Sequence, residues 1–289
     1  MLLLVAQIIG WLVLLILLIV LLILAYPLVE ILIWRQLWLR RLRATHSSAS
    51  KSPAADWSTA LIYLSGISHF ASPDLLRQQV TLLNELETKL KPDRVIKVAF
   101  PYEAETAEEF QRFDLWRRLG WKSTPTIIFS LRNFEQAALA NIFPNWYGKA
   151  VAECIAARLG NARAPKKLIV IGNSAGGSIL LSAAPFLRQR WQTLQITAIL
   201  CGGVYGSNRG FDHVAQFHQL LGSRDHWVDF GISITPSRRW EKGAIVKAKA
   251  EGRYHEHLIG DMAHFGTEGY YSDKYIGVTS AAISTIAKQ

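Results

Sequence analysis

A glycine-flanked serine is the first feature of the sequence that could do chemistry. The stretch KKLIVIGNSAGGSILL, residues 166–181, begins with strand-forming residues, turns sharply, and resumes as a helix-like run. The turn contains Gly172-x-Ser174-x-Gly176, a pattern that is typical of a nucleophilic serine when it lies between a strand and a helix. Such a serine sits on a strained turn, so its neighbours two positions away must be very small. An ordinary glycine-rich turn matches the same pattern.

Two phosphate-binding interpretations of this turn fit poorly. A dinucleotide-binding turn requires G-x-G-x-x-G, and Ser174 stands where the second glycine belongs. A phosphate loop of the Walker type requires Gly-Lys-Ser/Thr, which is absent here. We therefore expect nucleophilic chemistry rather than nucleotide binding.

A nucleophilic serine needs a base, and that base needs an acid to orient it. Asp225 follows a predicted strand in QLLGSRDHWVD, and His264 follows the next one in GDMAHFGTEGYY. The carboxyl ends of parallel strands meet at one edge of a sheet, so both residues should share an edge with Ser174. Asp229, four residues after Asp225, is the alternative acid.

Other acidic and histidine residues near this edge have simpler interpretations. Asp261 is closer to His264 in sequence, but we expect it to make local hydrogen bonds in its loop. Packing or surface positions are expected for the remaining histidines of this region, which are His226, His255 and His257.

Alternating strand and helix patterns surround these residues. Helical patterns are predicted over 72–90, over 148–160, from Gly176 until Pro185 ends or kinks the helix, and over 274–288. Strands separated by helices cannot pair as hairpins, so we predict a mostly parallel, doubly wound α/β sheet. The predicted strands are 59–66, 94–101, 166–172, 194–203, 217–223 and 253–260.

Residues 57–289 resemble the α/β-hydrolase family. The resemblance rests on an Ile-Gly-Asn-Ser-Ala-Gly-Gly elbow, a Gly-Ser-x-Asp acid loop and an Ala-His-Phe histidine loop, in the order Ser, Asp, His. It implies that Ser174 is the nucleophile, His264 the general base and then acid, and Asp225 the orienting carboxylate. The implied activity is cleavage of an ester or thioester through an acyl-enzyme, without a metal or organic cofactor.

The oxyanion donors are expected to be backbone amides. Ala175 follows the nucleophile at the start of a helix and supplies the first. The second should come from the loop after strand 59–66, where many family members carry His-Gly. This chain has Ser65-Gly66, which retains the glycine but not the histidine, and we predict Ile67 as the donor, with Ser68 as the alternative.

The N-terminus has the composition of a membrane anchor. Residues 8–26 are all non-polar, and about 20 apolar residues in a helix cross a hydrocarbon core of ~30 Å. A cleaved signal peptide would show a basic start, a shorter apolar run and a small-x-small cleavage site. A buried core helix would show a polar face. We predict a single transmembrane helix within residues 1–34.

The residues after this helix predict its orientation. Four arginines at 35, 40, 41 and 43 follow the apolar run, and positive residues stay on the cytoplasmic side. The catalytic domain is therefore expected on the cytoplasmic face. Residues 35–56 are predicted to be a basic flank and a flexible linker, since 45–56 are small, polar and proline-containing.

Charge and cysteine content exclude several classes of protein. The net charge is +10, but the basic residues are scattered, without a zinc-finger spacing, an RNA-binding aromatic motif or a basic recognition helix. We expect no nucleic-acid partner, and attraction to anionic lipid explains the charge more simply. Cys154 and Cys201 lie in apolar surroundings and are expected to be buried thiols, although a disulfide between them stays open.

The substrate is predicted only by class. Segment 204–216 is too short for a large cap domain, so the irregular segment 102–147 is the better lid candidate. Together with the anchor, Trp116, Trp121 and Trp146 favour a small-molecule ester that is lipid-derived or amphipathic. The alternative is a catalytically inactive hydrolase-fold protein that binds a lipid or a protein partner at the membrane.

Overall fold

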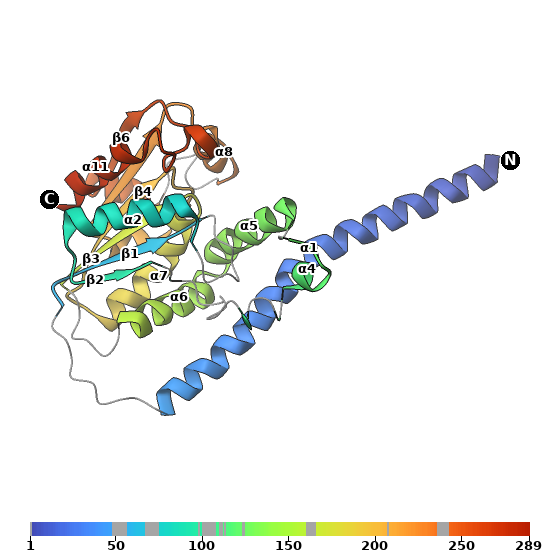
Figure 1. The fold of residues 1–289 in the computed structure, drawn as a ribbon, viewed down its shortest axis with the longest axis horizontal. Helices are drawn as coiled ribbons and strands as arrows, with labels where there is room; N and C mark the ends of the chain where they lie inside the picture. The colour runs from blue at the N-terminus through green and yellow to red at the C-terminus, as the bar shows by residue number, and fades with distance from the viewer. Residues whose placement is uncertain are drawn as a thin grey trace.

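A six-stranded, all-parallel β-sheet forms the centre of the domain in this computed structural model (Figure 1). The described residues are 2–47, 57–66, 75–97, 99, 108–109, 112, 114–122, 125–159, 166–206, 208–235 and 243–289. The spatial order of the strands is β2-β1-β3-β4-β5-β6. Their bounds are β1 Thr59–Leu64, β2 Arg94–Ile96, β3 Lys167–Asn173, β4 Gln195–Cys201, β5 Gln216–Gly222 and β6 Tyr254–Gly260. The prediction of a parallel α/β sheet is confirmed.

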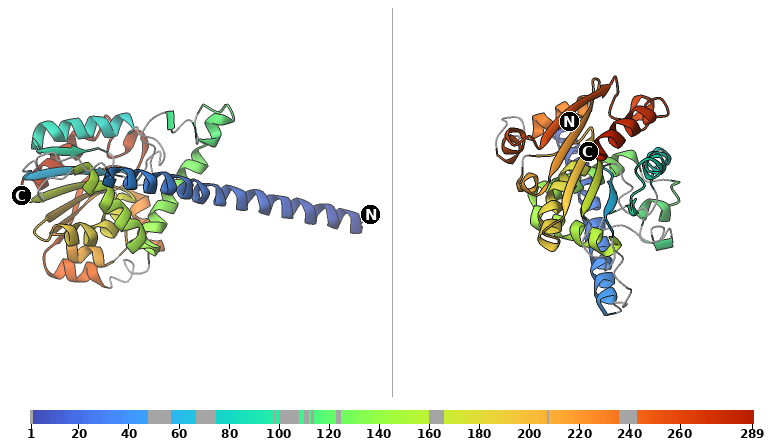
Figure 2. Two further views of the ribbon diagram at one scale, coloured as in Figure 1. Left: turned by 90° about the horizontal axis from the view of Figure 1, so that it is seen from below. Right: turned by 90° about the vertical axis from the view of Figure 1, so that its left-hand side faces the viewer.

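Helices cover both faces of this sheet. On one face lie α5, α6, α7 and α10, and on the other lie α2 and α11 (Figures 1 and 2). Side chains of β1 alternate between the two cores: Ala60, Ile62 and Leu64 pack on one side, and Leu61 and Tyr63 on the other. Because both faces are buried, such strands read as continuous apolar runs. The helices are α2 Arg77–Leu90, α4 Leu115–Arg118, α5 Thr126–Ile142, α6 Pro144–Leu159, α7 Gly176–Arg190, α8 His226–Ile234, α10 Ala244–Ala250 and α11 Ile276–Ala287, with 3-10 turns η1 Arg209–His213 and η2 Gly266–Glu268.

Pro185 does not end helix α7, which continues to Arg190. A proline at this position cannot bond to the carbonyl four residues earlier, that of Leu181. The backbone of Gly210 packs directly against that carbonyl, since a Cβ at 210 would lie 2.0 Å from the Leu181 oxygen. Close packing of η1 on α7 therefore holds the helix together where local preference would break it.

Segment 102–147 is more regular than its sequence indicates. It contains α4 and the 17-residue helix α5, and Ile128 and Ala140 of α5 are buried. Helix α5 packs against α1, α6 and α7, so its stability comes from tertiary contacts that local periodicity does not reveal.

The N-terminal helix α1 (Leu2–Ser47) is 46 residues long. Its apolar residues from Leu3 to Leu24 are exposed, and the helix is long and apolar enough to cross a membrane. The same helix continues through the basic flank and into the first residues of the linker predicted at 45–56, and it ends at Ser47. The rest of that predicted linker, 48–56, lies outside the described residues.

The second half of α1 is part of the domain. Ile31 and Trp34 are buried in the same core cluster as Ala140 of α5. The first half projects beyond the domain, on the side where the strands of the sheet end (Figures 1 and 2). Helix α1 and the sheet therefore have a fixed relative orientation.

A buried carboxyl group at the junction of α1 and α5 gives the first prediction. Burial, and then the nearby charge of Glu30, raise the pKa of Glu135 from 4.5 to about 7. An acid whose pKa is higher in the folded state destabilises the fold as pH rises from its unfolded pKa through its folded one. We expect Glu135→Gln to raise the free energy of unfolding by on the order of 1 kcal/mol above pH 7, allowing for solvent screening, and to have little effect near pH 4.

Thermal unfolding of the detergent-solubilised protein at several pH values measures this effect. Glu87→Gln is the matched control, because Glu87 is an exposed glutamate on α2. A pH-independent difference between Glu135→Gln and the wild type would contradict the prediction.

Candidate active site

Ser174 lies on a strained turn between β3 and α7. Its φ of 48° is in the left-handed region, which is uncommon for a residue with a side chain. A Cβ at Gly172 would lie 2.3 Å from Cδ2 of Leu200, and one at Gly176 would lie 2.2 Å from the carbonyl oxygen of Leu64. Both glycines of the motif are therefore required by close packing, of Gly172 against the Leu200 side chain and of Gly176 against the backbone of β1.

The end of β4 holds this turn in place. The Ser174 amide donates to the Cys201 carbonyl at 3.2 Å, and the Val204 amide donates to the Ser174 carbonyl at 2.8 Å. Hydrogen bonds on both sides of the residue offset the cost of its backbone conformation.

Asp225 and His264 form a buried pair at the ends of β5 and β6. Nδ1 of His264 lies 2.8 Å from Oδ1 and 2.9 Å from Oδ2 of Asp225, and both side chains are almost fully inaccessible to solvent. Asp225 also precedes α8, and its Oδ1 accepts from the amides of Trp227 (3.2 Å) and Val228 (3.3 Å). The acid is thus fixed by the start of a helix as well as by the histidine.

Tyr270 completes the surroundings of the acid. Its hydroxyl donates to Oδ2 of Asp225 at 2.7 Å and accepts from the Gly222 amide at 2.8 Å. Burial alone would raise the pKa of Asp225, but hydrogen bonds from His264 and Tyr270 and the charge of the imidazolium hold it below its usual value. Asp225 is therefore a carboxylate at neutral pH. Sequence reasoning missed Tyr270, because no pattern links it to the acid loop.

The contact with Asp225 determines which nitrogen of His264 can act as a base. An ionised carboxylate only accepts hydrogen bonds, so Nδ1 must carry the hydrogen and Nε2 has the free lone pair. Nε2 is buried and has no hydrogen-bond partner among the described residues. This is the state a general base needs before it takes a proton.

Gly202 lies between the Ser174 turn and the pair formed by Asp225 and His264. Its φ is 56°, and a Cβ there would lie 2.5 Å from Oδ2 of Asp225 and 2.9 Å from Nδ1 of His264. The preceding residue, Cys201, accepts the hydrogen bond from Ser174. The structure thus brings the three predicted residues to one edge of the sheet, with Asp225 and His264 in contact and no hydrogen bond from Ser174 to Nε2 of His264.

The backbone of β1 approaches the same turn. A Cβ at Gly66 would lie 2.5 Å from the Ala175 amide nitrogen and 2.8 Å from Cβ of Ser174. Ala175 precedes α7, where the first helical amides have no partner within the helix. Gly66 therefore leaves the predicted oxyanion amide uncovered, which explains why a glycine is needed after β1. The predicted second donor, Ile67, lies outside the described residues, as does Ser68.

We expect Gly66→Ala to lower kcat/KM for ester hydrolysis by roughly 10²-fold or more, the cost of losing one oxyanion donor. The added methyl group has no room beside Ser174 and Ala175, so the turn must shift. Steady-state hydrolysis of a soluble p-nitrophenyl ester measures the loss.

Gly277→Ala is the matched control, because a Cβ at this position on α11 meets nothing within 4 Å. Gly66→Ala with activity as high as that of Gly277→Ala would mean that the turn does not bind the oxyanion.

The rival residues have other partners. Asp229 is exposed, and its nearest basic group is the equally exposed His226, 3.9 Å away. Asp261 accepts from Ser223 at 2.6 Å and from Nε of Arg224 at 2.9 Å, which is the local loop bonding we predicted. The structure thus favours Asp225 over Asp229 as the acid.

Three histidines, at positions 218, 255 and 257, stack together across β5 and β6. His218 stacks on His255 and His257, and its Nδ1 lies 3.0 Å from Nε2 of His257. Burial, followed by the charges of these two neighbours, lowers the pKa of His218 to about 4. The stacking and the buried or partly buried positions of these side chains indicate a packing role, as predicted for His255 and His257.

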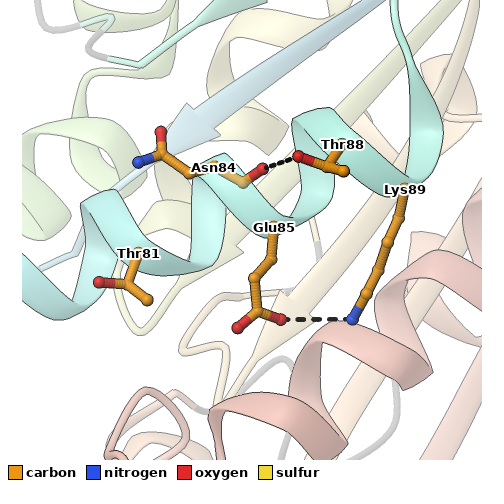
Figure 3. A pocket seen from close by; sticks show the side chains of 5 residues that line it. All are labelled: Thr81, Asn84, Glu85, Thr88 and Lys89. Atoms are coloured by element: carbon orange, nitrogen blue, oxygen red, sulfur yellow. Dashed lines mark hydrogen bonds and ion pairs between the residues drawn. The ribbon is translucent and has the colours of Figure 1, made fainter.

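No group of three or more metal-ligating side chains that could hold an ion is found among the described residues. Cys154 and Cys201 are both buried and free. A surface hollow over α2 involves none of the predicted site residues (Figure 3). Its lining residues come from that one helix and bond largely within it, as Lys89 does to Glu85 at 3.3 Å; they are Thr81, Asn84, Glu85, Thr88 and Lys89.

Comparison of the chain with protein-family models gives no match, and comparison with curated protein sequences gives none either.

Proposed function

We propose that the protein is a membrane-anchored serine hydrolase of the α/β-hydrolase type that cleaves an ester or a thioester. The observation that carries this proposal is the buried contact of 2.8 Å between Asp225 and His264, at the edge of the sheet where the strained Ser174 turn lies. A structural turn would not require a left-handed serine, a buried acid–histidine pair and an unpaired base nitrogen together.

In the proposed reaction, Ser174 Oγ attacks the substrate carbonyl carbon while Nε2 of His264 takes its proton. The ionised Asp225 stabilises the imidazolium, and the amide of Ala175 donates to the oxyanion. The tetrahedral intermediate collapses, and His264 returns the proton to the leaving alcohol or thiol. A water molecule then cleaves the acyl-enzyme by the same steps, releasing the acid and restoring Ser174.

The anchor in this proposal is the exposed apolar half of α1. Its residues Leu3–Leu24 would cross the bilayer, and the arginines that follow would keep the domain on the cytoplasmic face. No resident metal or organic cofactor has a role in the proposed reaction.

Labelling with a fluorophosphonate probe tests the proposal. The probe reacts covalently with a serine only if its hydroxyl is activated, so the wild-type protein should be labelled at one site. Peptide mapping should place the label on Ser174. Absence of labelling on the folded protein, or labelling of another serine, would remove the proposal.

One observation favours a second candidate, a catalytically inactive protein of the same fold that binds a lipid or protein at the membrane. No hydrogen bond links Nε2 of His264 to the Ser174 hydroxyl, so the serine would stay unactivated if this arrangement did not change when a ligand binds. The same labelling experiment separates the candidates, because an unactivated serine does not react.

A further inference from the structure

Aromatic residues mark the level at which α1 leaves the bilayer. After Leu24 the domain begins to cover one side of α1, where Pro27 and Glu30 are buried, while Leu28, Val29, Leu32 and Ile33 stay exposed. Tyr26, at this transition, contacts Trp116 of α4 with ring centroids 5.9 Å apart. Trp116 in turn contacts the exposed Trp121 at 5.5 Å. Tryptophan and tyrosine concentrate at the membrane–water interface, so this aromatic group places α4 at the lipid headgroups.

The domain cannot rotate freely about the part of α1 that follows Tyr26. Trp34 is 1% exposed and Ile31 is 2% exposed, both packed into the core of the domain. Helices α4, α5 and α8 lie at the end of the domain from which the first half of α1 projects (Figure 1). The carboxyl edge of the sheet, which carries Ser174 and His264, therefore faces the bilayer.

Exposed apolar side chains surround His264 at this edge. Phe265 is 42% exposed with its ring centroid 4.2 Å from that of His264, and Trp227 contacts Phe265 at 5.8 Å. Phe230, on the next turn of α8, contacts Trp227 at 5.9 Å. Three large aromatic side chains that are exposed together beside a candidate base form an apolar patch, and such a patch indicates contact with an apolar partner.

A second exposed apolar pair lies at the end of α5, which is bonded to the first turn of α7. Asn141 at the end of α5 donates to the hydroxyl of Ser178 at 2.9 Å, which fixes this end of α5 to the first turn of α7. The next two residues, Ile142 and Phe143, are 67% and 56% exposed. Exposed apolar side chains therefore occur near the start of α7, four residues after Ser174, as well as beside His264.

We propose that these five residues form an apolar rim that docks on the bilayer crossed by α1, and that the substrate is an acyl ester of a lipid resident in that bilayer. The rim residues are Ile142, Phe143, Trp227, Phe230 and Phe265. The substrate assignment rests on the proposed function, whereas the docking does not. A lipid whose acyl chain contacts the rim can bring its ester carbonyl to Ser174 without crossing water, and the rim is buried by the same contact.

A fluorescent label tests the docking without using activity. Phe230→Cys, labelled with an environment-sensitive fluorophore, is reconstituted in vesicles of phosphatidylcholine and phosphatidylglycerol with or without brominated acyl chains. Both native cysteines are buried, so the label goes to the new thiol. Thr193→Cys is the matched control, since Thr193 is exposed in the turn before β4, at the opposite edge of the sheet.

Bromolipid quenching should be about threefold stronger at position 230 than at position 193, with a blue-shifted emission. Ile142→Cys should behave like Phe230→Cys, which guards against a local effect of one substitution. Equal, weak quenching at all three positions would overturn the docking.

Activity then tests the substrate class. In Phe230→Glu, the ratio of hydrolysis of a vesicle-borne acylglycerol to that of a soluble p-nitrophenyl ester should fall roughly tenfold, because a charge on the rim opposes insertion. An unchanged ratio would overturn the lipid assignment. Quenching without fluorophosphonate labelling would leave the docking standing and remove the proposed function, whereas labelling without quenching would do the reverse.

Discussion

Ser174→Ala is expected to lower kcat/KM for ester hydrolysis by roughly 10⁴-fold or more, because the attacking hydroxyl is removed and only binding and oxyanion stabilisation remain. The turn is held by the backbone bonds from Ser174 to Cys201 and from Val204 to Ser174, so the variant should fold without the hydroxyl. Steady-state kinetics on a soluble p-nitrophenyl ester measures the loss, and fluorophosphonate labelling should disappear with it.

Two further serine variants separate chemistry from folding. Ser178→Ala is the matched control in the same turn: its hydroxyl donates to the Val204 carbonyl at 3.0 Å, so its loss should cost some stability but at most a few-fold in rate. Ser174→Gly should be as inactive as Ser174→Ala, yet melt at a higher temperature, because glycine adopts a φ of 48° without strain. Retained activity in either Ser174 variant would assign the nucleophile elsewhere.

The strands and the three candidate residues could be predicted because their signals are local. A strand buried on both faces is apolar throughout, as Leu61 to Leu64 of β1 are, and such runs separated by helical patterns predict a parallel sheet. The edge strands β2 and β6 are less buried and have weaker patterns. Parallel strands end at one edge, so the residues after β3, β5 and β6 had to be neighbours. The contact between Asp225 and His264 follows from that topology.

The features that were missed depend on contacts between distant segments. Tyr270 reaches Asp225 across 45 residues of sequence, and nothing in its neighbourhood points to that contact. Helix α7 continues through Pro185, where Gly210 packs against the Leu181 carbonyl, and Ile31 and Trp34 of α1 are buried in the core of the domain. In each case tertiary packing outweighs the local preference that the sequence expresses.

The attachment of α1 to the domain changes what the anchor implies. A flexible linker would let the site face any direction, so an anchor alone would say little about the substrate. Burial of Ile31 and Trp34 instead fixes the orientation of the domain relative to α1, and under the proposed anchoring it turns the site toward the bilayer. In the proposed orientation the fold sets the distance between the site and the lipid. The anchor is then an argument about the substrate as well as about where the protein is located.

Asp225→Asn is expected to lower kcat/KM by roughly 10³- to 10⁴-fold with little change in KM. The carboxylate accepts from Nδ1 of His264 and thereby leaves the lone pair on Nε2. An amide can donate its N–H to Nδ1, which moves the hydrogen to Nε2 and removes the base. With the amide oxygen at the Oδ1 position, the backbone amides of Trp227 and Val228 keep their acceptor. The amide nitrogen then takes the Oδ2 position, where the Tyr270 hydroxyl can accept from it instead of donating, so the loop should keep its shape and the variant should fold.

Asp229→Asn is the matched control, since Asp229 is the rival acid four residues away and is exposed. It should hydrolyse the soluble ester at the wild-type rate, because its side chain does not reach His264. Circular dichroism and thermal unfolding of both variants check that a loss of activity in either one does not come from misfolding. If the rate fell in Asp229→Asn and not in Asp225→Asn, the orienting carboxylate would be Asp229, and α8 would have to move for it to reach the imidazole.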